Sequence, residues 1–194
     1  MQKVLLYFQK ADPIIYDLLI KFGVHPPTKS TDLFLDLCET IISQQLSTKA
    51  ADTIFSRLKA MVTKTFTYEG LLKLDAEQMR KCGISYAKIK YIQNIATETS
   101  RGNLKIEELD KLSDEDVKDR LIKIKGIGHW TSEMLLMFSF GREDVFSYGD
   151  AGLRRAIKNL YGFKKEPTVN QMKKITDKWK PYRTYASRIL WKSL

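Results

Sequence analysis

A pair of glycines separated by one residue is the first feature of this sequence that suits ligand binding. Gly126 and Gly128 follow an amphipathic segment and directly precede a mostly apolar one, so they mark a reversal between two predicted helices. The N-terminus of the second helix exposes amides that lack intrahelical partners, and such amides bind phosphate without a side-chain charge. Lys123 and Lys125 beside the reversal favour phosphate. A plain turn between helices fits the same spacing, and both interpretations stay open from these residues alone.

Asp150 is the second such feature, because it stands directly before a predicted helix at residues 151–160. The partial positive charge at a helix N-terminus favours the ionised carboxylate. A fixed carboxylate stabilises positive charge that develops nearby in a reaction. Aspartate is also among the commonest N-cap residues, where its role is structural. Taken by itself, this residue fits the structural role more often than the chemical one.

The elements that must position these residues are almost all helical. Apolar residues at helical spacing recur along residues 31–42 and 50–58, and only residues 62–67 could form an extended piece. Helix starts are indicated at Ser47, at Asp75 with Gln78, at Ser85, at Ser113 with Asp116, and at Thr168 with Gln171. The helix that starts at Ser113 should run to Gly126, and the helix that starts at Thr168 should end at Pro181. We predict an all-α chain of about nine or ten short helices.

Composition excludes several classes of protein. With 43% hydrophobic and 29% charged residues among 194, the chain has the composition of an ordinary globular protein rather than a disordered or fibrous one. Its apolar runs are far shorter than the ~20 residues of a membrane span. Cys38 and Cys82 are isolated, which argues against structural zinc or an iron–sulfur cluster and predicts two small core residues. We therefore expect a cytoplasmic protein with no membrane partner and no metal site.

The charge of the chain is concentrated at one end. The 33 basic and 23 acidic residues give a net charge of +10. Residues 1–150 contain 21 of each sign, whereas residues 151–194 contain 12 basic and 2 acidic residues. Such a basic segment indicates a polyanionic partner, either nucleic acid or an anionic membrane surface. A solvated lysine-rich helix is the alternative.

Several sequence blocks, taken together, resemble the helix-hairpin-helix (HhH-GPD) DNA glycosylase superfamily. Within it, they are most similar to the alkylation-repair branch represented by 3-methyladenine DNA glycosylase II. The blocks are IISQQLSTKAA at 41–51, GISYAKIKYIQNIA at 83–96, KIKGIGHWTSEM at 123–134, DVFSYGDAGLRRA at 144–156 and WKPYRTYASRILW at 179–191. The hairpin alone is a weak signal. An aspartate that opens a helix some 20 residues after it is far more specific.

The resemblance implies two helical lobes with a DNA-binding cleft between them. The first lobe would span residues 33–143 and include the helix-hairpin-helix motif at residues 121–140. The second would combine residues 1–32 with residues 144–194 and include the basic C-terminal helices. Asp150 would then lie at the junction of the lobes.

The resemblance also implies the chemistry. Asp150 occupies the position of the family's catalytic aspartate, which stabilises the cationic sugar as the N-glycosidic bond breaks and helps to orient or deprotonate water. Trp130 stands where glycosylases that also cut the strand carry a Schiff-base lysine. The chain should therefore be monofunctional and leave an abasic site.

Further residues carry roles by resemblance. Trp130, Met134 and Trp191 would line the base pocket, where tryptophans attract cationic alkylated purines by cation–π stacking. Met134 departs from the aromatic residue usual in this branch, and Trp191 could instead be a core residue. The expected DNA contacts are Gln44, Gln45, Leu46 and Ser47 in a wedge turn, Gly126, Ile127, Gly128, His129 and Thr131 in the hairpin, and Arg154 and Arg155.

Two of these assignments have structural alternatives. Leu46 could be a buried hydrophobic staple instead of a residue that inserts into DNA. Lys88, in the second block, could contact phosphate, although a solvated helix face is the more ordinary place for it. Trp179, Tyr182 and Tyr185 should be packing residues rather than pocket walls.

The main functional hypothesis is a monofunctional DNA glycosylase of base excision repair. It would act as a monomer on damaged double-stranded DNA, flipping out and hydrolysing alkylated purines of the 3-methyladenine and 7-methylguanine type. No cofactor is expected beyond, at most, a monovalent cation that bridges hairpin carbonyls and a DNA phosphate. One alternative is a non-catalytic hairpin module that recognises damaged or distorted DNA. Another is a bifunctional glycosylase/lyase acting on oxidised bases.

Overall fold

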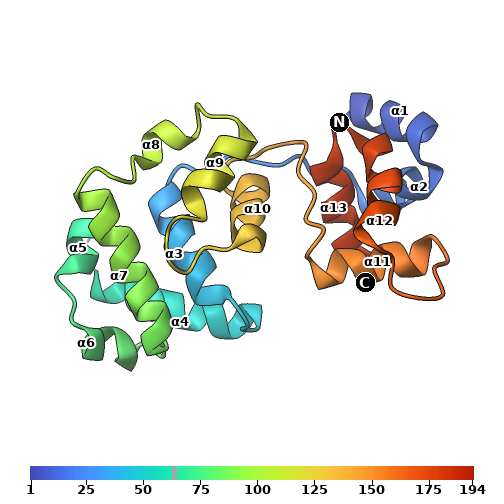
Figure 1. Ribbon diagram of the computed structural model, residues 1–194. Helices are drawn as coiled ribbons and strands as arrows, with labels where there is room; N and C mark the ends of the chain where they lie inside the picture. The colour runs from blue at the N-terminus through green and yellow to red at the C-terminus, as the bar shows by residue number, and fades with distance from the viewer. Residues whose placement is uncertain (63–64) are drawn as a thin grey trace. The chain divides into compact units, whose positions relative to one another are not determined.

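The computed structural model describes residues 1–62 and 65–194, and these two ranges contain helices and no β-strand (Figure 1). The all-α prediction is confirmed. The described residues form thirteen α-helices and one 3₁₀ helix, more than the nine or ten expected. The surplus includes elements of four and five residues, which are too short to produce a periodic pattern. The extended piece expected at 62–67 includes residues 63 and 64, which lie outside the described residues.

The contacts divide the chain into two compact units, which are described separately here. Unit 2 is the continuous segment Ser30–Leu135. Its helices are α3 (Leu33–Ser43), α4 (Thr48–Met61), α5 (Tyr68–Leu72), α6 (Ala76–Lys81), α7 (Tyr86–Ser100), α8 (Ile106–Leu109), α9 (Asp114–Leu121) and most of α10 (His129–Phe138). Helix α7 packs against α3, α5 and α6 (Figure 1) and buries Ile89, Ile92 and Ile95. It is the central helix of this unit.

Unit 1 combines Met1–Lys29 with Leu136–Leu194. Its helices are α1 (Gln2–Ala11), α2 (Pro13–Phe22), α11 (Ala151–Leu160), α12 (Val169–Thr176), the 3₁₀ helix η1 (Asp177–Trp179) and α13 (Arg183–Lys192). Helix α13 packs against both α2 and α11. Trp179, Tyr182 and Tyr185 are all buried, as expected for packing residues, but Tyr185 also lines a pocket beside Phe138 and Trp191.

The segment before α11 is bound to α13 by hydrogen bonds. The Thr184 amide donates to Glu143 O at 2.9 Å, and the Thr184 hydroxyl donates to Arg142 O at 2.6 Å. Residues 136–143 accordingly belong to unit 1 by their contacts, whereas the sequence analysis placed them in the lobe 33–143.

A buried aspartate joins the N-terminal helices to the rest of unit 1. Asp12 caps α2 by accepting from the amides of Ile14 (3.1 Å) and Ile15 (3.4 Å). Its other oxygen accepts from the Tyr161 hydroxyl (2.6 Å) and from Trp179 Nε1 (2.8 Å). Burial and the neighbouring carboxylate raise the pKa of Tyr161. One carboxylate thus connects α2 with the end of α11 and with η1.

The predicted helix starts are confirmed, and two predicted ends are wrong. Capping boxes form at Asp75 with Gln78 and at Thr168 with Gln171, and Ser47, Ser85 and Ser113 each cap a helix. Helix α9 ends at Leu121 rather than at Gly126, because consecutive turns replace it: Ile124 N bonds Leu121 O and Ile127 N bonds Ile124 O, both at 3.0 Å. Such i to i+3 turns keep the apolar spacing that predicted a longer helix. Helix α12 ends at Thr176 and η1 continues it.

Cys38 and Cys82 are both buried with free thiols, as expected for core residues. None of the helices within the described ranges is both long enough and apolar enough to cross a lipid bilayer.

Candidate active site

The hairpin of unit 2 depends on one of its two glycines. Gly126 has φ of +102°, and a Cβ at this position would overlap the ring of Tyr91. Ile127 is buried and anchors the turn, while Gly128 is exposed and its missing Cβ would meet open space. Helix α10 begins directly afterwards at His129, which is also exposed. The reversal is therefore built as the sequence predicted, with the start of α10 at the surface.

The turn at residues 44–47 is fastened to this hairpin. Gln44 Nε2 donates to Gly126 O at 3.3 Å and to Thr131 Oγ1 at 3.1 Å. Thr131 is buried, so its side chain serves this contact rather than facing solvent. Gln45 has φ of +59°, in the left-handed region, and Leu46 is 40% exposed. This exposure disfavours a buried staple at Leu46.

Lys88 holds the same turn from α7 and is partly buried rather than lying on a fully solvated helix face. Its ammonium donates to Ile42 O at 2.8 Å and to Gln44 O at 2.6 Å, at the C-terminal end of α3. Partial burial lowers the pKa of Lys88. A cation at a helix C-terminus also interacts favourably with the helix dipole. Lys88 and Gln44 thus join α3, α7 and the hairpin into one network.

Replacing Lys88 with methionine should loosen this turn. Methionine keeps most of the aliphatic volume but leaves two partly buried carbonyls without their donor, which costs about 1–3 kcal/mol. Urea unfolding should show this loss, and hydrogen exchange at residues 43–47 should accelerate. Lys90→Met is the matched control, because Lys90 is an exposed residue of the same helix. Equal effects of the two substitutions would contradict the network.

Asp150, in unit 1, is fixed by two donors. It is 9% exposed and caps α11, with Oδ1 accepting from Leu153 N at 2.8 Å and from Trp191 Nε1 at 2.9 Å. A Cβ on Gly152 would lie 3.0 Å from the Trp191 ring and 3.1 Å from Asp150 Oδ1. Glycine at position 152 therefore allows the indole and the carboxylate to approach. The aspartate is both a helix cap and the acceptor of a tryptophan.

An aromatic residue that was not predicted from the sequence lies next to this pair. Phe138 is 47% exposed, and its ring centroid lies 5.8 Å from that of Trp191 with the planes 33° apart. Arg188 also lies over the ring of Phe138, with its guanidinium carbon 5.7 Å from the ring centroid. Trp130, Met134 and Phe138 recur every four residues along α10, which is the signal that would have identified Phe138. Trp130 is 42% exposed, whereas Met134 is buried.

Comparison with known proteins identifies the family. The model of the "HhH-GPD superfamily base excision DNA repair protein" matches residues 38–181. The chain belongs to this superfamily. The match includes the turn at 44–47, the hairpin and Asp150, so the resemblance stated from the sequence blocks is confirmed.

Relatives of this HhH-GPD chain carry the name DNA-3-methyladenine glycosylase. It is 38% identical over 177 residues to DNA-3-methyladenine glycosylase 1 of Schizosaccharomyces pombe, covering 88% of this chain and 78% of the relative. It is also 34% identical over 165 residues to YfjP of Bacillus subtilis, a longer relative of which it spans 58%.

Solved structures show the same fold. The 3-methyladenine DNA glycosylase Mag1 of Schizosaccharomyces pombe, in complex with abasic DNA, superposes with a TM-score of 0.88 at 36% identity, covering 98% of this chain and 96% of Mag1. A DNA-3-methyladenine glycosidase of Bacillus halodurans superposes with a TM-score of 0.83, also at 36% identity, covering 96% of this chain and 86% of the other.

The predicted site residues of the HhH-GPD chain are divided between its units. Asp150, Arg154, Arg155 and Trp191 belong to unit 1, and the structure brings Asp150 and Trp191 into contact. The turn, the hairpin, Trp130 and Met134 belong to unit 2, where Gln44 connects the turn with the hairpin. Each group forms a local arrangement of its own.

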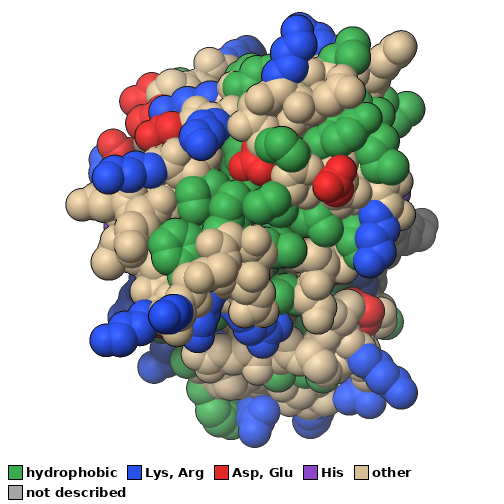
Figure 2. Space-filling view, turned by 90° about the vertical axis from the view of Figure 1, so that its right-hand side faces the viewer, with side chains coloured by type: hydrophobic (Ala, Val, Ile, Leu, Met, Phe, Trp, Pro, Cys, Tyr) green, Lys and Arg blue, Asp and Glu red, His purple; other side chains and the backbone are tan. Residues whose placement is uncertain are grey.

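The net positive charge of the chain belongs to unit 1. Unit 1 contains 17 basic and 7 acidic residues, a net charge of +10, whereas unit 2 contains 16 of each sign. Figure 2 shows many Lys and Arg side chains around an apolar area, with fewer acidic ones between them. Arg154 forms an ion pair with Glu166 (Nε to Oε1, 2.8 Å), while Arg155 is exposed. Of these two arginines, Arg155 presents the more accessible charge.

Within the described residues, no group of three or more His, Cys, Asp or Glu side chains is arranged to hold a metal ion.

Proposed function

We propose that this chain is a monofunctional DNA glycosylase that flips alkylated purines out of duplex DNA and releases them by hydrolysis. The observation that carries the proposal is the Asp150 carboxylate, which is nearly buried and oriented by Leu153 N and Trp191 Nε1 in a chain of the HhH-GPD superfamily. A carboxylate with a fixed orientation does not need to reorganise when positive charge develops beside it. Such a group suits a reaction that passes through a cation.

Cleavage of the N-glycosidic bond is that kind of reaction. The bonding electron pair leaves with the base, and the deoxyribose becomes oxocarbenium-like. A base that is already cationic through alkylation leaves as a neutral molecule, which makes it the better leaving group. In the proposed mechanism Asp150 stabilises the sugar cation and then orients the water that attacks C1′, accepting its proton. The products are the free base and an abasic site.

The absence of strand cleavage is proposed from Trp130. An indole cannot form the Schiff base through which a lysine would attack the sugar. Water is then the nucleophile, and the abasic strand stays intact. The exposure of Trp130 suits a residue that stacks on an extruded base.

Recognition of alkylated purines is proposed to rest on flat, electron-rich walls. Trp130 and Trp191 would supply cation–π stacking of about 1–2 kcal/mol per contact. Met134 contributes a polarisable thioether to the same helix as Trp130, and a thioether adapts to ligands of different shape. We infer a pocket that accepts more than one alkylated purine.

Access to the base requires a distorted duplex. We propose that Leu46, presented by the left-handed turn at Gln45, enters the gap left by the extruded nucleotide. Gln45 and Ser47 would bond the orphaned base or the backbone. Amides of residues 126–131 would hold a phosphate, and Arg154 and Arg155 would attract the duplex.

The proposed partner is therefore double-stranded DNA that contains damaged bases, bound by a monomer. The chemistry requires neither metal nor organic cofactor, because the carboxylate and water suffice. A monovalent cation between hairpin carbonyls and a phosphate is compatible with the proposal. The working compartment would be the cytoplasm, with association to the nucleoid if the source is a prokaryote.

The experiment is a panel of duplexes that each contain one lesion. Wild-type protein is incubated in excess with 7-methylguanine, 3-methyladenine, ethenoadenine or hypoxanthine duplexes, and alkali then reveals abasic sites. We expect strand breaks after alkali on at least one alkylated purine and none before it. Tight binding to abasic DNA with no release on any lesion would favour a non-catalytic module. A covalent adduct trapped by borohydride would favour a lyase.

A further inference from the structure

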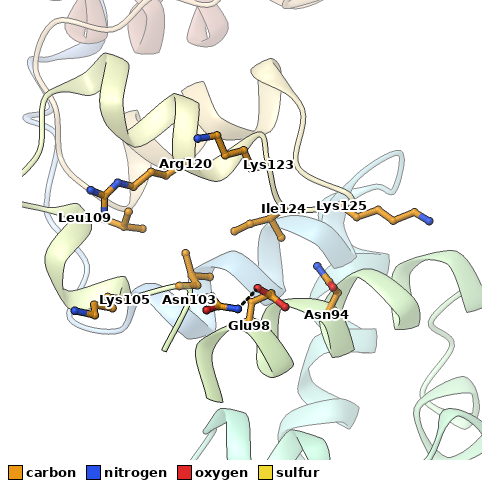
Figure 3. A pocket seen from close by; sticks show the side chains of 10 residues that line it. Asn94, Glu98, Asn103, Lys105, Leu109, Arg120, Lys123, Ile124 and Lys125 are labelled. Carbon is orange, nitrogen blue, oxygen red and sulfur yellow. Dashed lines mark hydrogen bonds between the residues drawn. The ribbon is translucent and has the colours of Figure 1, made fainter. Parts of the chain in front are cut away.

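Unit 2 contains a pocket that includes Lys123 and Lys125, the two lysines before the hairpin, but none of the residues expected to contact DNA or to line the base pocket. It has a volume of about 440 Å³ and lies between α7, the α8 region and the segment that leads into the hairpin (Figure 3). Its lining residues are Asn94, Glu98, Asn103, Leu104, Lys105, Leu109, Arg120, Lys123, Ile124 and Lys125. All ten belong to one compact unit, so the pocket is defined by that unit alone.

The charge of this pocket is strongly positive. Four of its lining residues are cationic and one is anionic, although unit 2 as a whole contains 16 basic and 16 acidic residues. Lys105 is paired with Glu108 (Nζ to Oε1, 3.2 Å). Within the described ranges, Arg120, Lys123 and Lys125 form no ion pair. Among the described residues, three cations that form no ion pair therefore border one hollow.

The single carboxylate of the pocket is already engaged. Glu98 Oε2 accepts from Asn103 Nδ2 at 2.9 Å, and Oε1 lies 3.6 Å from Arg101 Nη1. Figure 3 shows Glu98 and Asn94 on the α7 side, and Arg120, Lys123 and Ile124 on the opposite side. An anion bound beside Arg120 and Lys123 would thus face Glu98 only across the pocket. The Glu98 carboxylate is itself held there by Arg101 and by the side-chain amide of Asn103. The charge arrangement suits an anionic ligand.

The place of the pocket indicates which anion it meets. Lys123 precedes Gly126 by three residues, so their Cα atoms are at most about 11 Å apart. That distance corresponds to about three base-pair steps of 3.4 Å measured along the axis of a DNA duplex. A strand that is held at the hairpin amides and runs toward Lys123 would reach the pocket within a few nucleotides.

We propose that this pocket binds a backbone phosphate of the DNA strand a few nucleotides beyond the one held by the hairpin. The inference rests on the proposed function, because it assumes that the hairpin grips DNA. Arg120 and Lys123 bond the phosphate oxygens, and Lys105 and Lys125 add positive potential at the two ends of the hollow. Arg120 supplies a planar, bidentate donor of the kind that phosphate oxygens match. The pocket lengthens the footprint on DNA without reading its sequence.

The test is the length and salt dependence of binding by a double variant. The variant R120Q/K123Q removes two cations of the pocket. The matched control is K111Q/K118Q, which removes two cations of the same segment that lie outside the pocket. Each protein is titrated with duplexes that carry an abasic-site analogue and are extended by two base pairs at a time on one side or the other. Circular dichroism and urea unfolding establish that both variants are folded.

We expect wild type to gain affinity when the duplex is extended on one side of the analogue. R120Q/K123Q should lack this gain, and on the long duplexes its salt slope should be smaller than that of wild type by about 1 to 2. The control variant should keep the gain. If R120Q/K123Q loses the same factor in affinity on duplexes of every length, the pocket contributes only general positive potential, and the proposal is wrong.

A second arm separates DNA from a free nucleotide. Binding of dAMP and of inorganic phosphate is measured by titration followed in NMR spectra of the ¹⁵N-labelled protein. If dAMP binds wild type but not R120Q/K123Q while DNA binding by the two is equal, the pocket serves a soluble ligand and the proposal is wrong. If wild type binds none of the duplexes, the proposed function fails as well. If wild type binds them and releases bases but R120Q/K123Q matches the control, only the pocket proposal fails.

Discussion

Asp150→Asn should lower the single-turnover rate of base release by roughly 10²- to 10³-fold, the usual effect of removing one preorganised electrostatic contact to a transition state. Asparagine has nearly the same shape, and its oxygen can still accept from Leu153 N and Trp191 Nε1. What it lacks is the negative charge that stabilises the sugar cation. The rate is measured on a 7-methylguanine duplex with enzyme in excess.

The fold should survive this substitution, which keeps the interpretation clear. Asparagine and aspartate are about equally good N-caps, so urea unfolding should show little change. Binding to an abasic-site analogue should also persist, because it does not need the carboxylate charge. A rate within tenfold of wild type, in a variant that is folded and binds DNA, would remove Asp150 from the chemistry.

Asp12→Ala should destabilise the protein by about 3–5 kcal/mol, the largest effect on stability that we expect from a single side chain. It removes the cap of α2, which is worth about 0.5–2 kcal/mol. It also leaves the buried Trp179 Nε1 and the Tyr161 hydroxyl without their acceptor, at about 1–3 kcal/mol each. These terms overlap, so their simple sum is an upper limit. Urea unfolding followed by far-ultraviolet circular dichroism gives the loss.

Two comparisons show whether the loss arises from the network. Asp17→Ala removes an exposed carboxylate from the same helix and should change the free energy of unfolding by less than about 0.5 kcal/mol. Asp12→Asn can keep the cap but supplies only one acceptor oxygen, so its effect should be intermediate. If the free energies of unfolding of Asp12→Ala and Asp17→Ala differ by less than 1 kcal/mol, the buried carboxylate does not hold unit 1 together.

Local signals in the sequence predicted local features of this fold. The capping boxes at residues 75–78 and 168–171 were predictable because side chain and amide lie three residues apart and need no tertiary context. The hairpin was predictable for the same reason, since Gly126 is required by its own backbone angle. The end of α9 was predicted wrongly, because helix and 3₁₀ turns leave similar apolar spacing over one turn.

Contacts between distant residues left no such signal. Lys88 bonds a carbonyl 44 residues away, and Trp179 bonds Asp12 across 167 residues. A lysine on an amphipathic helix has the same pattern whether it is solvated or bonded to another helix. Phe138 was missed because a strongly apolar helix hides which of its residues reach the surface. The candidate site was found through a resemblance in its motifs, while the residues that hold it in place needed the structure.

Product analysis on a duplex with a single 7-methylguanine tests the central claim most directly. The reaction mixture is divided, and one part is analysed for the free base by chromatography and mass spectrometry. The other is run on a denaturing gel before and after alkali. We expect free 7-methylguanine in amounts equal to the abasic strand, a strand that breaks only after alkali, and no adduct after borohydride. An unchanged duplex, or a strand cut before alkali with a trapped covalent intermediate, would contradict it.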